Sequence, residues 1–425
     1  MIIMKRNIIS LLVLMVSFTG LWAQSPIINV NGFYFRLMSN VDSTNAKVAV
    51  VTNLGNTDYY KGEITIPSSV SSQGVEYPVT AIGELAFKGC KELTSITIPS
   101  SVTTVPAGAF YGCDKLASIV VAAGNPVYDS RDNCNAVVET ATNTIIAGCS
   151  KTAIPTSVAS LGECAFYGSR GLTTLTVSDN IKQIGQWTFL DCENIESLNW
   201  NSVCSPASVT YYASESIKEI VLGDSVKSVY GLARCGNLKS IVIPDGVTRI
   251  EQSAFAMCTG LESIVIPSSV TRIDAEAFRG CTGLKSITIP SSVQFIASNA
   301  FRDCNNVETL YWNSNFSLNI LRNFKTSLKT IVIGDSVKTL ELYVFDGCVN
   351  LTTVTVEQGN PVFDSRNGCN AIIETATNTF LLGCRSSVIP EGVTAITFFN
   401  FKFSIVTVLV PSSLVTTFKV PLLAI

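Results

Sequence analysis

The sequence contains no histidine, and only 14% of its residues are charged. Without histidine, the Ser-His-Asp and Cys-His catalytic arrangements are excluded, together with the commonest zinc ligand and the usual pH switch. The 29 basic residues are outnumbered by 32 acidic ones. Because there is no surplus of positive charge to neutralise phosphates, the composition also argues against nucleic acid as a partner.

Motifs for bound cofactors and for covalent catalysis are missing as well. No Gly-rich phosphate loop, nucleophile elbow or Cys-x-x-Cys pair is present, although the chain has 14 cysteines. No cofactor, metal or catalytic residue is therefore predicted, and we expect a protein that is not an enzyme. A Ser-Lys or two-carboxylate site is the catalytic arrangement that the sequence leaves open.

Hydrophobic residues make up 47% of the 425 residues, which excludes disorder as the main state. A single compact core stops growing at about 250–300 residues, so the length predicts either two domains or a repeat architecture.

The two ends of the chain are distinct from the rest. Residues 1–23 are typical of a secretory signal, because Lys5 and Arg6 precede an apolar stretch that is too short for a membrane-spanning helix of about 20 residues. We therefore expect a secreted or cell-surface protein with no transmembrane segment in the mature chain; an uncleaved membrane anchor is the alternative. Residues 411–425 form an atypical apolar tail that lacks the polar cap expected at the end of a stack of repeats.

A repeat of about 23 residues runs through most of the chain. The segments Leu261-Glu-Ser-Ile-Val-Ile-Pro-Ser-Ser-Val270 and Leu284-Lys-Ser-Ile-Thr-Ile-Pro-Ser-Ser-Val293 are nearly identical, and an Ala-Phe-x-x-Cys block precedes each. The second Ile of this unit recurs at Ile66, Ile98, Val121, Ile154, Val177, Trp200, Leu222, Ile243, Ile266, Ile289, Trp312, Ile333, Val356, Ile389 and Val410.

The Ile-x-Ile core of each unit predicts a short strand that the following proline ends. Strands this far apart cannot pair as hairpins, so the intervening segment must return the chain and the strands must be parallel. The sequence therefore predicts a β-rich repeat solenoid with one short parallel strand per turn, or rung, and short convex or helical turns. Residues 76–410 are the predicted solenoid.

Two repeats are longer than the others, and both contain nearly the same insertion. Residues 124–149 match residues 359–384 at 18 of 26 positions. Each copy is predicted to form a hairpin, near 124–150 and near 359–385, in place of the ordinary convex return.

The unit Ala-Phe-x-Gly-Cys-x-x-Leu-x-x-Ile-x-Ile-Pro-x-Ser-Val resembles the BspA-type leucine-rich repeat of secreted bacterial proteins, over about residues 80–410. Residues 24–75 resemble the N-terminal capping module of that family, with alternating strands that shield the first rung. The resemblance implies a curved solenoid and roles in adhesion. Expected partners are host extracellular-matrix proteins, mucin-type glycoproteins or other bacterial surfaces.

Most cysteines fall at equivalent positions of successive rungs, where parallel side chains favour a column of buried thiols over disulfides. The pairs Cys134–Cys149 and Cys369–Cys384 are the best disulfide candidates, although burial is favoured there too. Asp129-Ser-Arg-Asp132 suggests a turn rather than a calcium site, since Asn367 replaces Asp132 in the second copy.

The register also separates buried aromatic residues from exposed ones. Trp200 and Trp312 occupy inward positions and are expected in the core. Tyr311 should point outward and Trp187 should lie on the return side, so both are better candidates for ligand contact.

The outward face of the strands is the predicted binding surface, because it is long, uncharged and rich in Ser, Thr and Val. A purely structural explanation, that β-branched residues suit strands, accounts for single positions equally well. A passive spacer or envelope component without a ligand is the alternative function. The candidate binding residues are Thr97, Thr176, Asn199, Val242, Val265, Thr288, Tyr311 and Val332.

Overall fold

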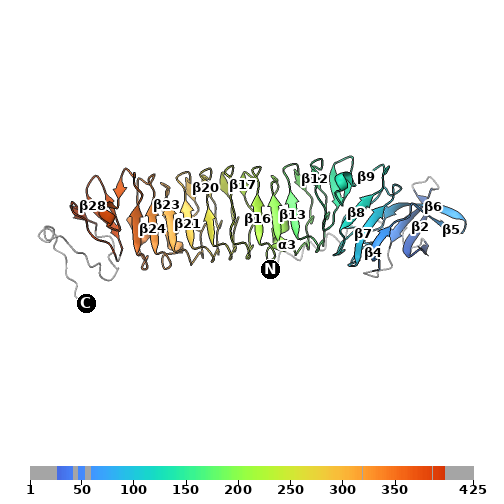
Figure 1. Cartoon of the computed structure of the whole chain (residues 1–425), viewed down its shortest axis with the longest axis horizontal. Helices are drawn as coiled ribbons and strands as arrows, with labels where there is room; N and C mark the ends of the chain where they lie inside the picture. Colours follow the sequence, from blue (N-terminus) through green and yellow to red (C-terminus); the bar gives the residue numbers. More distant parts are fainter. Residues whose placement is uncertain (1–25, 42–45, 53–58, 318, 385, 398–425) are drawn as a thin grey trace. The chain divides into compact units, whose positions relative to one another are not determined.

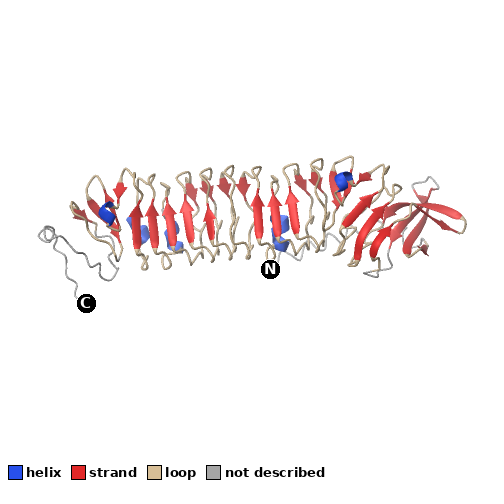
Figure 2. Cartoon of the chain, in the orientation of Figure 1, coloured by secondary structure: helices blue, strands red, loops and turns tan. Residues whose placement is uncertain are grey.

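The computed structural model describes residues 26–41, 46–52, 59–317, 319–384 and 386–397 (Figure 1). The predicted leader at 1–23 and the predicted tail at 411–425 lie outside the described residues. The chain divides into two compact units, residues 1–173 with 180–192 and residues 174–179 with 193–425. Strands and loops make up nearly all of both units, and the helices are short (Figure 2).

The first unit begins with a mixed sheet whose strand order is β1-β2-β3-β6-β5. All neighbouring pairs are antiparallel except β3 and β6. Its strands are β1 (Ile27–Val30), β2 (Phe33–Val41), β3 (Ala46–Thr52), β5 (Ser69–Ser72) and β6 (Val75–Ile82). The strand β6 begins at residue 75, where the predicted capping module ends, and continues to Ile82.

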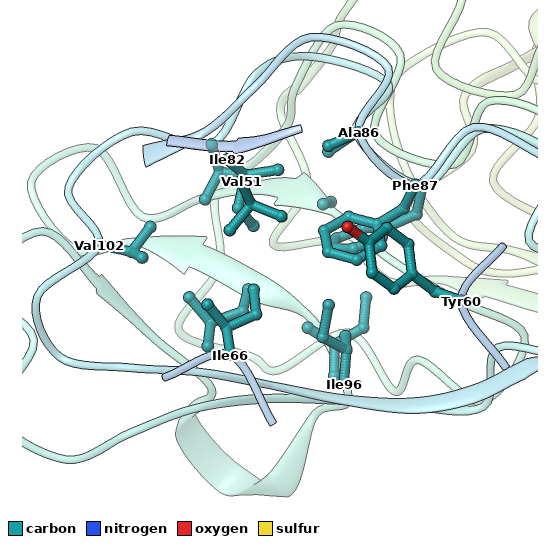
Figure 3. Close-up of a cluster of buried hydrophobic side chains, with 14 of the residues drawn as sticks. Val51, Tyr60, Ile66, Ile82, Ala86, Phe87, Ile96 and Val102 are labelled. Carbon is teal, nitrogen blue, oxygen red and sulfur yellow. The ribbon is translucent and has the colours of Figure 1, made fainter. Parts of the chain in front are cut away.

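The solenoid ladder starts inside this module. Strand β4 (Gly62–Thr65) pairs in parallel with β7 (Leu93–Ile98), which pairs with β8 (Ser118–Val121). Figure 3 shows Tyr60 lying beside Phe87, whose ring centroid is 5.0 Å from that of Tyr60. Val51 and Ile82 of the mixed sheet belong to the same buried cluster as Ile66 and Ile96 of the first rungs. One continuous core thus joins the N-terminal sheet to the solenoid.

The second unit contains the most regular rungs. Parallel strands lie in register along two sheets, which confirms the predicted solenoid. Inward residues such as Ile287, Leu310 and Ile331 are fully buried. The strands are β13 (Thr174–Val177), β15 (Ser197–Trp200) and β16 (Glu219–Leu222) in one sheet, and β19 (Ser263–Val265), β21 (Ser286–Ile289), β23 (Thr309–Trp312), β24 (Thr330–Ile333) and β25 (Thr353–Val356) in the other.

A second, narrower sheet follows the prolines of the rungs. In the second unit its strands have two residues each, and the second residue of each strand is buried. In the second unit they are β17 (Ser228–Val229), β18 (Arg249–Ile250), β20 (Arg272–Ile273) and β22 (Phe295–Ile296). In the first unit, β12 (Ser160–Leu161) and β14 (Gln183–Ile184) have the same role.

Each long insertion forms an antiparallel hairpin that joins this narrower sheet. Strands β10 (Val137–Glu139) and β11 (Thr144–Ala147) make the first, and β11 continues in parallel with β12. Strand β9 (Tyr128–Asp129) lies along the other side of β10. The second copy repeats the arrangement with β26 (Phe363–Asp364), β27 (Ala371–Glu374), β28 (Thr379–Gly383) and β29 (Ala395–Ile396).

The first hairpin changes how the return turns stack. The ring centroids of Tyr111 and Tyr167 are 4.1 Å apart, although 56 residues separate them in the sequence. The turn at 165–169 therefore packs directly on the turn at 109–113, because the hairpin rung contributes no turn of its own on this side.

Three of the predicted parallel strands are absent or incomplete in the described residues. Ile154 and Ile389 are not in strands, and Ile243 follows only an isolated bridge between Val242 and Val265. The segment that follows each hairpin forms backbone hydrogen bonds with the hairpin's own loop and not with a neighbouring strand. Ala153 N donates to Cys134 O, and Val388 N donates to Cys369 O. The inserted chain thus takes the place of the neighbouring strand.

Short helices lie in the connections between strands. They are η1 (Arg131–Asn133), α3 (Ala207–Ala213), η2 (Asn319–Asn323), η3 (Leu342–Phe345) and η4 (Arg366–Gly368). Asp132 and Asn367 adopt left-handed backbone φ values of 57° and 56° in η1 and η4. Asp and Asn both tolerate this conformation, which explains why they interchange there.

Candidate functional site

The outward face is built by the regular strands of the second unit. Val265, Thr288, Tyr311 and Val332 occupy directly opposed positions on β19, β21, β23 and β24. Because side chains alternate along a strand, the residues on either side of each point into the core. Val265 and Tyr311 are 72% and 42% exposed, Thr288 is exposed and Val332 is half-buried. We call these four residues the outward face.

Val242 and the pair Thr176 and Asn199 extend the prediction within the same unit. Val242 is 82% exposed and forms a bridge with Val265, so it continues the outward face. Thr176 and Asn199 are opposed on β13 and β15, and Asn199 Nδ2 donates to Thr176 Oγ1 at 3.2 Å. Thr97 is half-buried on β7 of the first unit.

The electrostatics of the outward face are nearly neutral. None of its residues carries a charge, and the flanking row of Lys and Glu forms ion pairs across rungs. Lys239 Nζ is 3.3 Å from Glu262 Oε1, and Lys329 Nζ is 3.0 Å from Glu308 Oε1. Such exposed pairs contribute little stability, but they cancel the charge along the edge of the face.

Trp200 and Trp312 are core residues, as predicted, since each is 1% exposed. Trp187 is 38% exposed on the return side. Asp129-Ser-Arg-Asp132 forms a turn, as predicted, because Arg131 N donates to Asp129 Oδ1 at 3.2 Å; Arg131 Nε and Nη2 also donate to the two oxygens of Asp129 at 2.9 and 2.8 Å. Among the residues that the structure describes, no group of three or more His, Cys, Asp or Glu side chains is placed to bind a metal.

A cavity of about 120 Å³ lies between two rungs of the second unit, and sequence reasoning missed it. Trp200, Leu222 and Leu232 supply much of its apolar wall, and Cys204, Lys227 and Tyr230 line its polar side. The Tyr230 hydroxyl donates to Val203 O at 3.3 Å and Lys227 Nζ donates to Asp224 O at 2.8 Å. Both polar groups therefore already have backbone partners, and the cavity shows no acid–base pair.

The cysteine column is buried, as predicted, and none of the 14 cysteines, all of which lie in the described ranges, forms a disulfide. Thiols of successive rungs donate to the backbone of the preceding turn: Cys281 Sγ lies 3.0 Å from Phe255 O, and Cys304 Sγ lies 3.0 Å from Phe278 O. The spacing is 26 residues in both cases. Cysteine thus serves as a small apolar side chain with a weak donor. Cys164 and Cys204 are partly exposed exceptions.

We expect one fast-reacting thiol in the folded protein at pH 8, that of Cys204, because it is partly exposed and twelve of the other thiols are buried. Reaction requires the thiolate, and burial raises the pKa of Cys164 to about 11 and that of Cys304 to about 12. Labelling with a chromogenic disulfide reagent should show one rapid equivalent that Cys204→Ser removes, and 14 equivalents after unfolding. More than three rapid equivalents, or fewer than nine in the denatured protein, would contradict the buried column.

Within the described ranges, no helix has the length and hydrophobicity to cross a membrane.

Comparison with known families now identifies the class. Residues 58–134, 146–262 and 250–367 match the model of the BspA type leucine-rich repeat region, in six copies. Since the matches span well over half of the chain, it belongs to this family of repeat proteins. A comparison with curated proteins finds no match.

Several solved structures are similar to this chain at low sequence identity. A leucine-rich repeat protein from Bacteroides ovatus is 22% identical over 87% of this chain and 88% of its own, with a TM-score of 0.45. A leucine rich cell surface protein from Faecalibacterium prausnitzii is 22% identical over 78% and 95%, with a TM-score of 0.32. The pneumococcal vaccine antigen PcpA is 16% identical over 79% and 94%, with a TM-score of 0.35.

Proposed function

We propose that this protein is exported and binds a protein or glycan through the outward face, without catalysing a reaction. The observation that carries the proposal is the contiguous, uncharged row from Val242 to Val332 on strands held in register, exposed at every position except the half-buried Val332. Such a row presents apolar and hydroxyl-bearing groups to an extended partner at regular intervals. The apolar start of the chain and membership of a family of secreted repeat proteins support export.

Host extracellular-matrix proteins, mucin-type glycoproteins and other bacterial surfaces are the proposed partners. The chemistry of the face favours contacts through apolar side chains and hydroxyl groups rather than through charge. Tyr311 is the best anchor, since a half-exposed aromatic ring supplies large contact area at low entropic cost.

The double variant Thr288→Glu and Tyr311→Glu should weaken binding to a panel of immobilised matrix and mucin-type proteins by at least about tenfold. Each new carboxylate must lose its water in the contact without gaining a partner. The matched control, Thr282→Glu with Gln294→Glu, adds the same charge at exposed positions of the same unit and should change binding less than about twofold.

Saturable binding that the double variant loses and the control retains would support the proposal. If the folded protein binds no component of the panel, the spacer function is favoured instead. If both variants bind as well as the parent, the outward face is not the binding surface. Circular dichroism on all three proteins checks that folding is intact.

A further inference from the structure

Two arginines lie side by side on the narrower sheet of the second unit. Arg249 on β18 and Arg272 on β20 are directly opposed partners in the parallel ladder. Neighbouring strands are about 4.8 Å apart, and like charges in opposed positions repel each other. The fold must therefore compensate for this pair.

Asp274 supplies the compensation. Its Oδ2 accepts a hydrogen bond from Arg249 Nε at 2.6 Å, and its Oδ1 accepts one from Arg272 Nε at 2.6 Å. The residue is only 6% exposed. Burial alone would raise the pKa of Asp274, but the bonds from the two arginines hold it below its usual value. We call Arg249, Asp274 and Arg272 the arginine fork.

The outer nitrogens of the fork remain available. Each arginine contacts Asp274 only through Nε. Within the described part of the chain, the Nη1 and Nη2 atoms of both arginines have no hydrogen-bond partner. Their side chains are 48% and 46% exposed. Because each Nε is tied to one buried carboxylate, the two guanidinium groups are held in place rather than free to sample many rotamers.

The charges around the fork nearly cancel. Glu251, on the rung of Arg249, interacts electrostatically with that arginine, and Lys227 on the preceding rung is bonded to the Asp224 carbonyl. The fork is thus a source of directed hydrogen bonds rather than a broad positive patch. Oxyanions that present two oxygens, such as carboxylates and tetrahedral phosphate-like groups, are what guanidinium N–H pairs recognise best.

Aromatic rings flank the fork on one side. The Arg272 guanidinium carbon is 4.1 Å from the ring centroid of Phe295, which is 5.7 Å from that of Phe316. Both rings are half-buried, so part of each is accessible. A flat apolar surface next to an oxyanion site suits a ligand with both an anionic group and an apolar face, such as the C–H face of a sugar ring.

We propose that the arginine fork, with Phe295, binds a sulfate or carboxylate group of an acidic glycan. This site is separate from the outward face, which has no charged residue. The anion bridges the outer N–H groups of Arg249 and Arg272, and the sugar ring packs on Phe295.

Calorimetric titration of the intact protein with a sulfated oligosaccharide at physiological salt tests the proposal. The variant Arg249→Gln with Arg272→Gln should weaken binding at least about tenfold, because two bidentate charge-assisted contacts are lost. Arg249→Lys with Arg272→Lys keeps the charge next to Asp274 and should still weaken binding several-fold, since ammonium groups lack the planar donor pairs.

The chain offers a matched control. Arg279 and Arg302 also lie on adjacent rungs and share one carboxylate, Asp303, but loosely, with each Nε 3.7 Å from Oδ2 and Asp303 53% exposed. Arg279→Gln with Arg302→Gln removes the same charge and should change binding less than about twofold, because only directed contacts at the fork are involved. The outward-face variant Thr288→Glu with Tyr311→Glu should leave binding of the oligosaccharide unchanged.

Three results would overturn the proposal. One is the absence of binding to both sulfated and uronate-only oligosaccharides. Another is equal loss in the two arginine-pair variants, which would indicate non-specific charge. The third is fork-dependent binding of poly-glutamate as tight as that of the glycan, which would indicate an acidic protein as ligand. If binding persists, comparing desulfated and carboxyl-reduced oligosaccharides shows which anion is recognised.

Discussion

Replacing Phe278 with alanine is expected to lower the free energy of unfolding by about 3–5 kcal/mol, the range for large-to-small changes in a packed core. The rings of Phe255, Phe278 and Phe301 are stacked and fully buried in three successive turns. The centroid of Phe278 is 5.3 Å from that of Phe255 and 4.9 Å from that of Phe301. Losing the middle ring leaves a cavity and removes both aromatic contacts.

Urea denaturation followed by tryptophan fluorescence measures this effect. Because each rung of a solenoid contacts mainly its neighbours, the variant should also unfold in a broader transition, with the damaged rungs opening first. Phe295→Ala is the control, since that ring is half-buried and its loss should cost about 1 kcal/mol. Equal destabilisation by the two variants would contradict the stacked core.

Raising the pH from 8 to 10 is expected to destabilise the protein by several kcal/mol. Burial raises the pKa of Cys304 to about 12 and that of Cys348 to about 11, and it raises the pKa of Cys113 and Cys281 further. An unfolded thiol ionises near pH 8.5, so each buried thiol costs about 2 kcal/mol at pH 10.

Stability falls with rising pH because the folded and unfolded states bind different numbers of protons. Below pH 8 both states keep these protons, so the thiols make no difference. Between the unfolded and folded pKa values the unfolded state binds fewer protons, and stability therefore falls as the pH rises.

The variant Cys281→Ser with Cys304→Ser tests whether the thiols are the cause. Serine keeps a donor for the Phe255 and Phe278 carbonyls, and Ser169 occupies the equivalent position in another rung. The loss of stability between pH 8 and 10 should be about 4 kcal/mol smaller in this variant, because two titrating groups are gone. If urea midpoints at pH 8 and 10 shift equally in variant and parent, other groups control the alkaline transition.

The repeat made most of the architecture predictable from sequence. Alternation around each Ile-x-Ile core correctly placed Trp200 and Trp312 inside and Tyr311 outside, because side chains of a strand alternate between two faces. The same pattern failed at Ile154 and Ile389. There the hairpin loops at Cys134 and Cys369 take the backbone hydrogen bonds that a neighbouring strand would otherwise make. The period of the repeat does not indicate which of two segments will form these bonds.

The candidate surfaces were predictable to different degrees. The outward face follows from the phase of the repeat, so its residues could be named in advance. The arginine fork could not, because Arg249 and Asp274 are 25 residues apart and Asp274 occupies a position held by Glu251 and Ala297 in adjacent rungs. No repeated motif marks it. Nor does any pattern indicate the cavity beside Cys204, which depends on how two unequal rungs fit together.

The parallel solenoid, the buried column of cysteines and the uncharged row on the strands were all predicted from the amino-acid sequence alone. These features depend only on a period that is repeated many times, so local periodicity is sufficient to define them. The folded chain alone shows where the hairpins displace a strand, which thiols donate to which carbonyls and which charged groups meet across rungs. Those outcomes depend on packing between particular neighbouring rungs, where side-chain volume and hydrogen-bond geometry select one partner among several.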